Sequence, residues 1–375
     1  MAISSRTAEQ QRDQDEHEAI LSRISAMRTQ ESQNYAFTRY CFLEGSTTEQ
    51  NMENFQEDLT NEPTDALCRT KMVDWCYSVV DHCEFSRSNV FIAASNLDRY
   101  LSTPAGQKAL RSRREFQLAC MTAIYTSIKI NEVETLTPKG MARVSRGDYT
   151  AQEIEACELD MLLALKWHVN PPSIIAFVWQ YIALLRLILK GSSHDAVLSQ
   201  EEQKLMEHII VNANYQIEMA SRDYKFVGID ASKVALAAVL NAIASAKVDN
   251  FCPGNSAHAI KGSLCTKLSV DFKSIVPLCN DLLGIFLPSA DQVDDVVSTS
   301  AISHDDHTRD ESFDSNTSFD DVTKTNAIVA AIASAKVVSP KSVKGPTPIH
   351  NKHPILGSLL CGILEPLRLL QDVEE

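Results

Sequence analysis

The residue types that catalyse reactions or bind metals are present in this sequence, but their spacing matches neither task. Its ten cysteines include no C-x-x-C pair, and its ten histidines include no H-x-x-x-H or H-E-x-x-H motif. His304 and His307 lie three residues apart in a Ser- and Asp-rich segment, which is typical of solvated chain rather than of a zinc site. No glycine-rich phosphate loop, protein-kinase signature or Ser/His/Asp motif occurs. We therefore expect no metal, no cofactor and no catalytic residue.

The composition indicates a folded protein with two domains and polar ends. The chain has 375 residues, of which 44% are hydrophobic and 22% are charged, and roughly 150 residues make a typical domain. Lys and Arg number 35 against 49 Asp and Glu, so the net charge of -14 argues against binding dominated by nucleic-acid phosphates. The longest apolar stretch, 174–189, is interrupted by Gln180 and Arg186, so we expect no membrane span. The polar first 20 residues carry no secretory signal, so the cysteines are expected to be buried free thiols in a reducing compartment.

Apolar residues recur at helical spacing from about residue 64 to residue 288, and strand-like alternation is nearly absent. Thr150-x-x-Glu153 and Ser199-x-x-Glu202 are capping boxes, which mark helix starts. Together with the other cap signals, among them Asp230, the periodicity predicts helices near 65–82, 88–101, 113–130, from Thr137-Pro138, 150–166, 173–189, 199–221, 230–248, 257–268 and 271–287. We therefore predict an all-α protein with two tandem five-helix domains, over 64–172 and 173–288.

Both ends of the chain are predicted to be disordered tails. Residues 1–60 are polar, and within them only 18–27 has the apolar spacing of a short helix. Residues 289–323 hold ten Asp or Glu against one basic residue, Arg309, a composition that cannot form a core. We assign all of 289–375 to an acidic, Ser/Thr-rich and Pro-containing tail.

The first row of predicted helices resembles the cyclin box. The matching stretches are Arg69-Thr70-Lys71-Met72-Val73-Asp74-Trp75, Asn96-Leu97-Asp98-Arg99-Tyr100-Leu101, Gln117-Leu118-Ala119, Ile128-Lys129-Ile130-Asn131-Glu132 and Cys157-Glu158-Leu159-Asp160-Met161-Leu162. Their order and spacing agree with the family as well as their residue types. The second row looks like the more divergent second cyclin fold, with its best match from Tyr224 to Ala235.

This resemblance implies both a fold and a function. It implies two tandem five-helix cyclin folds, and a regulatory subunit that is not itself an enzyme. Such a subunit binds and activates the catalytic subunit of a cyclin-dependent Ser/Thr protein kinase as a heterodimer, and so controls cell-cycle progression in the nucleus and cytoplasm. No nucleic acid, membrane or cofactor is implied. The class stays open between D-like and A/B-like cyclins, and an algal or protist member would fit.

The resemblance also assigns roles to single residues. Lys129 and Glu158 match the Lys and Glu that hydrogen-bond the kinase backbone in the family, although a Lys at a helix C-terminus is more often a dipole complement. Glu132 keeps one half of the acidic pair that follows this Lys. Arg69 and Asp98 match a structural ion pair inside the box, with two unrelated surface charges as the alternative.

The substrate-docking patch of the family is altered in this sequence. Its matching positions are Cys68, Lys71, Met72, Trp75 and Gln117. A cation therefore stands at one apolar position, and Ser78 replaces the usual acid. Both changes disfavour peptides that bring an Arg, so we expect substrates or inhibitors to meet a modified patch rather than an ordinary Arg-x-Leu site. Trp75 is equally compatible with a role in the core.

Two alternative functions remain open at the level of the sequence. The first is a transcription-type cyclin, which also activates a kinase and is distinguished by the identity of that kinase. The second is an adaptor of the TFIIB type, which pairs two cyclin folds on DNA. That adaptor needs a basic face and usually a zinc ribbon, and the sequence has neither.

Overall fold

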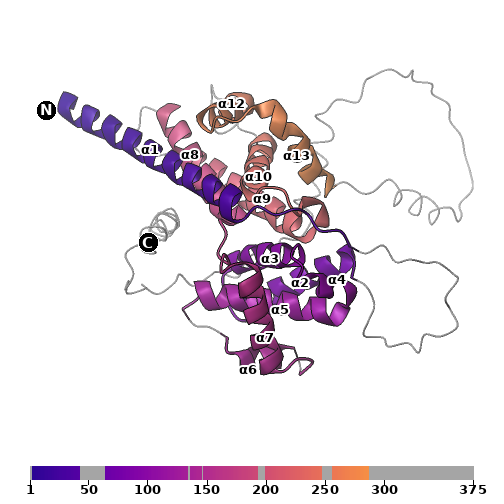
Figure 1. Cartoon of the computed structure of the whole chain (residues 1–375). Helices are drawn as coiled ribbons and strands as arrows, with labels where there is room; N and C mark the ends of the chain where they lie inside the picture. The colour runs from indigo at the N-terminus through magenta and orange to yellow at the C-terminus, as the bar shows by residue number, and fades with distance from the viewer. Residues whose placement is uncertain are drawn as a thin grey trace, which may run out of the picture. The chain divides into compact units, whose positions relative to one another are not determined.

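The computed structural model describes residues 2–42, 64–133, 136–145, 147–192, 199–246 and 256–286. Over these ranges every regular element is a helix, as Figure 1 shows, so the predicted all-α class is confirmed for this part of the chain. The predicted tail residues 43–60 and 289–375 lie outside the described residues. Among the described helices none is long and apolar enough to cross a bilayer.

The first hydrophobic core lies among the helices of the first row. They are α2 (Ala66–His82), α3 (Ser88–Leu101), α4 (Gln107–Arg111), α5 (Arg113–Asn131), α6 (Pro138–Val144) and α7 (Ala151–Ala164). The short α4 is absent from the prediction. Helix α5 is central, because every residue from Leu118 to Ile128 is buried. Its many small side chains allow neighbouring helices to pack on several sides.

Capping residues place the starts of these helices where the sequence predicts them. Asp65 accepts a hydrogen bond from the Cys68 amide at 2.7 Å and begins α2. Thr137 caps α6 ahead of its first-turn proline. Thr150 and Glu153 bond each other's backbone amides in a complete capping box at α7. Because each cap satisfies a backbone donor that the helix itself cannot, these positions fix the boundaries locally.

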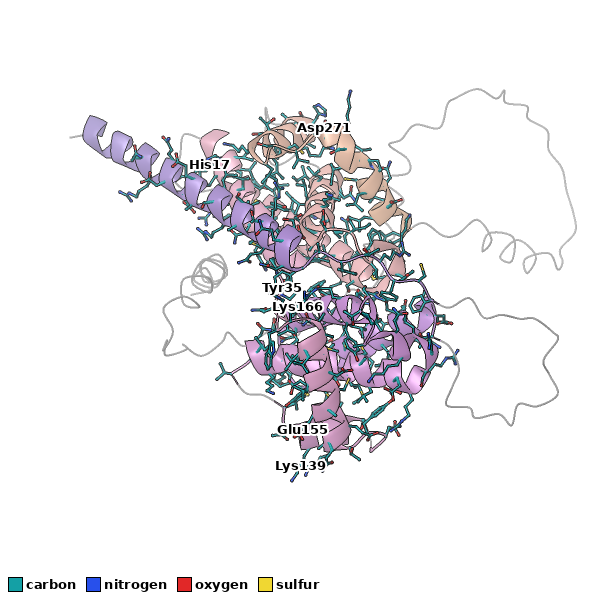
Figure 2. All side chains as sticks on the ribbon, viewed as in Figure 1. His17, Tyr35, Lys139, Glu155, Lys166 and Asp271 are labelled. Atoms are coloured by element: carbon teal, nitrogen blue, oxygen red, sulfur yellow. The ribbon has the colours of Figure 1, made fainter. Side chains whose placement is uncertain are left out.

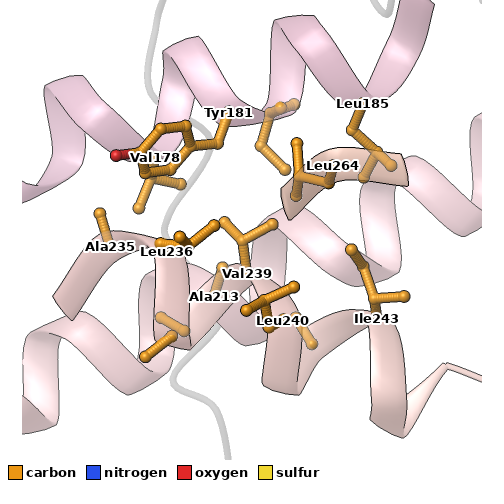
Figure 3. Close-up of a cluster of buried hydrophobic side chains, with 14 of the residues drawn as sticks. Val178, Tyr181, Leu185, Ala213, Ala235, Leu236, Val239, Leu240, Ile243 and Leu264 are labelled. Atoms are coloured by element: carbon orange, nitrogen blue, oxygen red, sulfur yellow. The ribbon is translucent and has the colours of Figure 1, made fainter. Parts of the chain in front are cut away.

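The second core lies among five further helices. They are α8 (Ile174–Ser192), α9 (Gln200–Arg222), α10 (Ala231–Ser245), α12 (Ala257–Lys267) and α13 (Phe272–Gly284). Helix α10 is the counterpart of α5, because all its residues from Val234 to Ile243 are buried. Figure 3 shows how Val239 and its neighbours on α10 meet Tyr181 of α8 and Leu264 of α12. Alanines on α10 keep these helix axes close together.

The N-terminal segment is a long helix rather than a tail with one short helix. Helix α1 spans Ala2–Asn34, whereas the prediction limited helix to 18–27. Its buried Ile20 and Ile24 belong to the second core. The guanidinium of Arg28 donates to the Leu268 carbonyl at 3.1 Å and to the Tyr181 hydroxyl at 3.3 Å. The prediction was wrong because the apolar stripe is short and the rest of the helix is polar.

The start of α10 is capped by α1 and not by its own preceding residue. Asp230 occupies the N-cap position predicted for it, but its side chain makes no cap bond and pairs with Lys233 at 2.7 Å. Glu31 of α1 takes its place. One of its carboxylate oxygens accepts from the Ser232 amide at 3.0 Å, and the other accepts from the Ser232 hydroxyl at 2.6 Å. The second helix set is therefore completed by residues from the far end of the sequence.

Residues 35–42 continue from α1 as a strap that contacts both helix sets. Tyr35, labelled in Figure 2, donates its hydroxyl to the Asn170 carbonyl at 3.0 Å. The Tyr224 hydroxyl, in the short 3-10 helix Tyr224–Phe226 that follows α9, donates to the Tyr40 carbonyl. Gly228 has a φ of +81°, and a Cβ there would lie 3.2 Å from the Cβ of Arg39. Glycine therefore allows both the left-handed turn and the close approach of the strap.

Candidate functional site

A buried ion pair of the first helix set also connects to the second helix set and to the strap. The guanidinium of Arg69 on α2 makes two bonds to the carboxylate of Asp98 on α3, at 2.9 and 2.7 Å, and both side chains are less than 8% exposed. A further Arg69 nitrogen donates to the Ser221 carbonyl at 2.9 Å. The Tyr40 hydroxyl completes the cluster by donating to Asp98 at 3.0 Å. The pair suggested by the resemblance is therefore an internal connection between α2, α3 and the end of α9.

Lys129 and Glu158 lie together at the surface of the first helix set. The ammonium of Lys129, near the end of α5, is 3.1 and 3.0 Å from the two carboxylate oxygens of Glu158 on α7. The Glu158 side chain is 10% exposed, whereas that of Lys129 is 49% exposed. The Thr126 hydroxyl adds a bond of 3.4 Å to the same carboxylate. The two predicted contact residues thus form one small polar unit whose cation faces solvent.

The charge on Lys129 is reinforced by its surroundings. Partial burial on its own lowers the pKa of Lys129, but the hydrogen bond and the attraction to Glu158 outweigh burial and raise this pKa. The Tyr125 ring lies 5.5 Å below the ammonium and adds a cation–π contact. The site therefore presents a positive charge that its neighbours hold in place, because the ammonium contacts both oxygens of Glu158 and also hydrogen-bonds the Tyr125 side chain.

Glu132 has a position of its own, after the end of α5. One of its carboxylate oxygens accepts from the Ser86 amide at 2.9 Å and from the Asn89 side chain at 2.6 Å. These donors lie at the start of α3. The structure therefore engages Glu132 within the first helix set, and does not bring it into the Lys129–Glu158 unit.

Exposed apolar side chains flank the Lys129–Glu158 unit, and the sequence analysis missed them. Of the seven large apolar residues that are strongly exposed within the described ranges, five lie between residues 130 and 167. They are Ile130 (43%), Val133 (77%), Leu159 (53%), Leu163 (60%) and Trp167 (62%). Within the described residues, the exposed large apolar groups are therefore concentrated on α5 and α7 and directly after them, and exposed apolar patches are typical of interaction surfaces. We call these five residues the apolar rim.

Trp167 is exposed and lies directly after the C-terminal end of α7. Leu159, Leu163 and Trp167 follow each other at intervals of four residues, so the first two share one face of the helix. Lys166 and Trp167 have φ angles of +52° and +64°, a conformation that non-glycine residues rarely adopt. The Trp167 amide bonds the Leu162 carbonyl at 2.9 Å and stabilises this turn. The spacing of these residues was visible in the sequence, but α7 is apolar on two faces and periodicity does not tell which one is buried.

The five residues at the docking-patch positions lie on α2 and α5. Cys68, Met72 and Trp75 are half-buried against the first core, while Lys71 is exposed. The amide oxygen of Gln117 accepts from the Tyr149 hydroxyl at 3.2 Å. The Ser78 hydroxyl bonds the Asp74 carbonyl in its own helix, at 3.1 Å. The patch thus combines a half-buried apolar floor with a solvent-facing lysine.

No group of three or more potential metal ligands gathers anywhere in the part of the chain that the structure describes. Lys129, Glu158 and the apolar rim all lie on α5 and α7 or directly after these helices.

Comparison with known proteins agrees with the fold and the motifs. Residues 40–170 match the family model of the cyclin N-terminal domain. The chain is 29% identical over 171 residues to Cyclin-B1-1 of Oryza sativa subsp. japonica, covering 46% of this chain and 34% of that one. It is 26% identical over 188 residues to Putative cyclin-A3-1 of Arabidopsis thaliana, covering 50% and 46%. It is 27% identical over 161 residues to the G2/mitotic-specific cyclin CLB2 of Candida albicans, covering 43% and 28%.

The matches thus span less than half of the length of these three relatives. A viral cyclin structure from herpesvirus saimiri aligns with a TM-score of 0.44 and 19% identity, over 59% of this chain and 84% of that chain. The domain match, the named relatives and the motifs on α2, α3, α5 and α7 agree: residues 40–170 are similar to the N-terminal domain of cyclins, and the relatives include B-type, A-type and G2/mitotic-specific cyclins.

Proposed function

We propose that this protein acts as a cell-cycle cyclin, which binds a cyclin-dependent Ser/Thr protein kinase and switches it to its active conformation without doing chemistry itself. The observation that supports this most directly is the Lys129–Glu158 unit flanked by the apolar rim. A partner with an apolar face and exposed backbone groups fits this surface. Relatives named as G2/mitotic-specific cyclins support a role in the cell cycle.

The two parts of the surface would have different tasks. Full burial of a Leu or Phe-sized side chain contributes about 1.5–3 kcal/mol, so covering the apolar rim supplies most of the affinity. The Lys129 ammonium contacts both oxygens of Glu158, and its side chain is 49% exposed, so a carbonyl of the partner can approach it from solvent. Charged donors to backbone carbonyls are strong and directional, so this unit sets the orientation of the kinase.

Activation follows from which kinase conformation this surface prefers. A kinase needs its internal Lys–Glu ion pair in place, and that requires its C-helix to be turned inward. A rigid surface on α5 and α7 that binds only the inward C-helix would shift the kinase towards the active state by its difference in affinity. We expect this complex in the nucleus and cytoplasm, which a fluorescent fusion of the full chain would check.

The test exchanges the two charges of the site. In Lys129→Glu/Glu158→Lys an internal ion pair is retained, so folding is preserved, but the solvent-facing group becomes an acid. The matched control is Lys225→Asp/Asp281→Lys, which exchanges an exposed pair of 2.8 Å on the second helix set. Each full chain is mixed with a panel of purified cyclin-dependent kinases, and binding and phosphorylation of a Ser-Pro substrate are measured.

We expect the wild type and the control to bind and activate the same kinase, and the site variant to lose at least tenfold in affinity. If the site variant activates as well as the wild type, the surface is wrongly assigned. If the wild type binds no kinase of the panel, the proposed function is wrong. Activation of only an RNA-polymerase-tail kinase would instead support the transcription-type alternative.

A further inference from the structure

Two cysteines from different helices meet in the middle of the first core. The sulfur of Cys76 on α2 lies 3.6 Å from the sulfur of Cys120 on α5. Their side chains are 3% and 2% exposed, and both are present as thiols. The residues are 44 positions apart in the sequence, so the fold itself creates this neighbourhood. None of the motifs of the proposed function uses either sulfur.

We propose that Cys76 and Cys120 form a redox-active pair that closes to a disulfide between α2 and α5. A disulfide requires the two sulfurs to approach to about 2.05 Å, which from their present contact is a movement of roughly 1.5 Å. Small rotations of the two side chains or a slight closing of the helices supply such a movement. The inference stands independently of the proposed function, because the bond is a property of the first core alone.

The oxidant in this reaction is a peroxide. The thiolate of one cysteine attacks one oxygen of hydrogen peroxide and breaks the O–O bond, so the sulfur becomes sulfenic acid and the other oxygen leaves as hydroxide, which takes up the proton lost by the thiol to become water. The second thiol then attacks that sulfur, forms the S–S bond and expels a second water with its proton. Two thiols lose two electrons and one peroxide gains them, so the step is balanced.

The buried environment slows oxidation of the two thiols and also slows reduction of the disulfide once it has formed. The hydrogen bond between the two cysteines and their burial raise the pKa of Cys76 well above that of a free thiol, although the nearby charge of Arg69 favours the thiolate. Little thiolate is therefore present in the closed structure, and oxidation proceeds when α2 and α5 open transiently. The same burial protects the finished disulfide from thiol reductants.

The disulfide would alter surfaces on both helices. Met72 and Trp75 of the docking patch lie on α2 next to Cys76, and the Cys120 sulfur already contacts the Met72 carbonyl at 3.9 Å. Gln117 lies on α5 beside Cys120. A covalent bond between α2 and α5 would thus restrict the movement of the apolar residues of the patch. Oxidation in the core would in this way change a surface of the protein.

The experiment oxidises the full chain with hydrogen peroxide under native conditions. Free thiols are then blocked in denaturant, and tryptic peptides are mapped by mass spectrometry before and after dithiothreitol. We expect a Cys76–Cys120 crosslinked peptide that dithiothreitol removes, and a higher Tm of the oxidised protein, because a disulfide restricts the unfolded chain. Cys157→Ala, which changes another buried cysteine of the same core, should retain the crosslink, and Cys76→Ala should lose it.

Recovery of both peptides as free thiols, while exposed Cys41 is oxidised, would overturn the proposal. So would crosslinks of Cys76 or Cys120 to other cysteines in place of each other. If the alanine variants do not fold, the peptide map of the oxidised wild type is sufficient to decide between these outcomes.

Discussion

At the scale of single residues, the Arg69–Asp98 pair and the Lys129–Glu158 pair are chemically alike and do different work. The first is buried and bonded on all sides, so its value is internal. The second has one buried and one exposed member, so its cation is available to a partner. Burial, rather than residue type, separates the structural pair from the candidate contact.

Removing Arg69 should destabilise the protein severely. Arg69→Ala leaves the Asp98 carboxylate buried without its counter-charge, which costs about 3–5 kcal/mol. Urea unfolding followed by circular dichroism measures this loss. Lys204→Ala, which breaks an exposed pair with Glu201, is the control and should cost less than about 1 kcal/mol. Equal losses for the two variants would mean that the buried pair does not hold the helix sets together.

The apolar rim gives a prediction on affinity rather than stability. Trp167→Ala should weaken kinase binding by about 2 kcal/mol, roughly 30-fold, as expected for an anchoring aromatic at an interface. Its side chain is 62% exposed, so the thermal midpoint should barely change. Val211→Ala on α9, at a position 51% exposed, is the matched control. Calorimetric titration with the kinase measures both affinities. If the Trp167 and Val211 variants bind the kinase equally well, the apolar rim does not contribute to binding.

At the scale of the elements, caps were the most informative signals in the sequence. Asp65, Thr137, Thr150 and Ser199 begin their helices where they were expected, because a cap acts within one turn of chain. Asp230 failed because Glu31, distant in sequence, supplies the bonds instead. A cap supplied by a neighbouring residue could be predicted from the sequence, whereas a cap supplied by another helix could not.

The capping box of α7 should make stability fall in acid. Backbone and side-chain bonds from Thr150 hold the pKa of Glu153 below its ordinary value of 4.5. A depressed pKa contributes stability that is present above the unfolded value and is lost as the pH falls through the folded value. Glu153→Gln should therefore show a shallower decline of unfolding free energy below pH 4.5 than the wild type, in urea titrations at a series of pH values.

The docking of α1 depends on two isoleucines. Ile24→Ala should cost about 2–5 kcal/mol, because a buried Ile leaves a cavity in the second core. Limited proteolysis should then cut the chain before residue 35 more rapidly. Ser25→Ala, at the next and exposed position, should leave both measurements unchanged. Unchanged cleavage of the Ile24 variant would show that α1 does not rely on this contact.

At the scale of the whole molecule, the helical fold was predictable from the sequence, whereas only part of the proposed contact surface was. Motif order indicated the resemblance to the cyclin box, which agrees with the domain match over residues 40–170, and Lys129 and Glu158 do lie together across α5 and α7. Leu163 and Trp167 escaped notice, since an apolar residue on a helix predicts burial unless the neighbouring elements are known. Exposure is a property of the assembled fold, and so the apolar rim became visible only there.

The bond between Arg28 and the Leu268 carbonyl joins residues 240 positions apart, and this separation has a consequence for biosynthesis. Helix α1 is synthesised before α8, α10 and α12, which supply its contacts. Through most of translation, Ile20 and Ile24 are without the surface that buries them, and such exposed apolar groups are what chaperones bind. The second helix set must therefore be synthesised before α1 can pack against it.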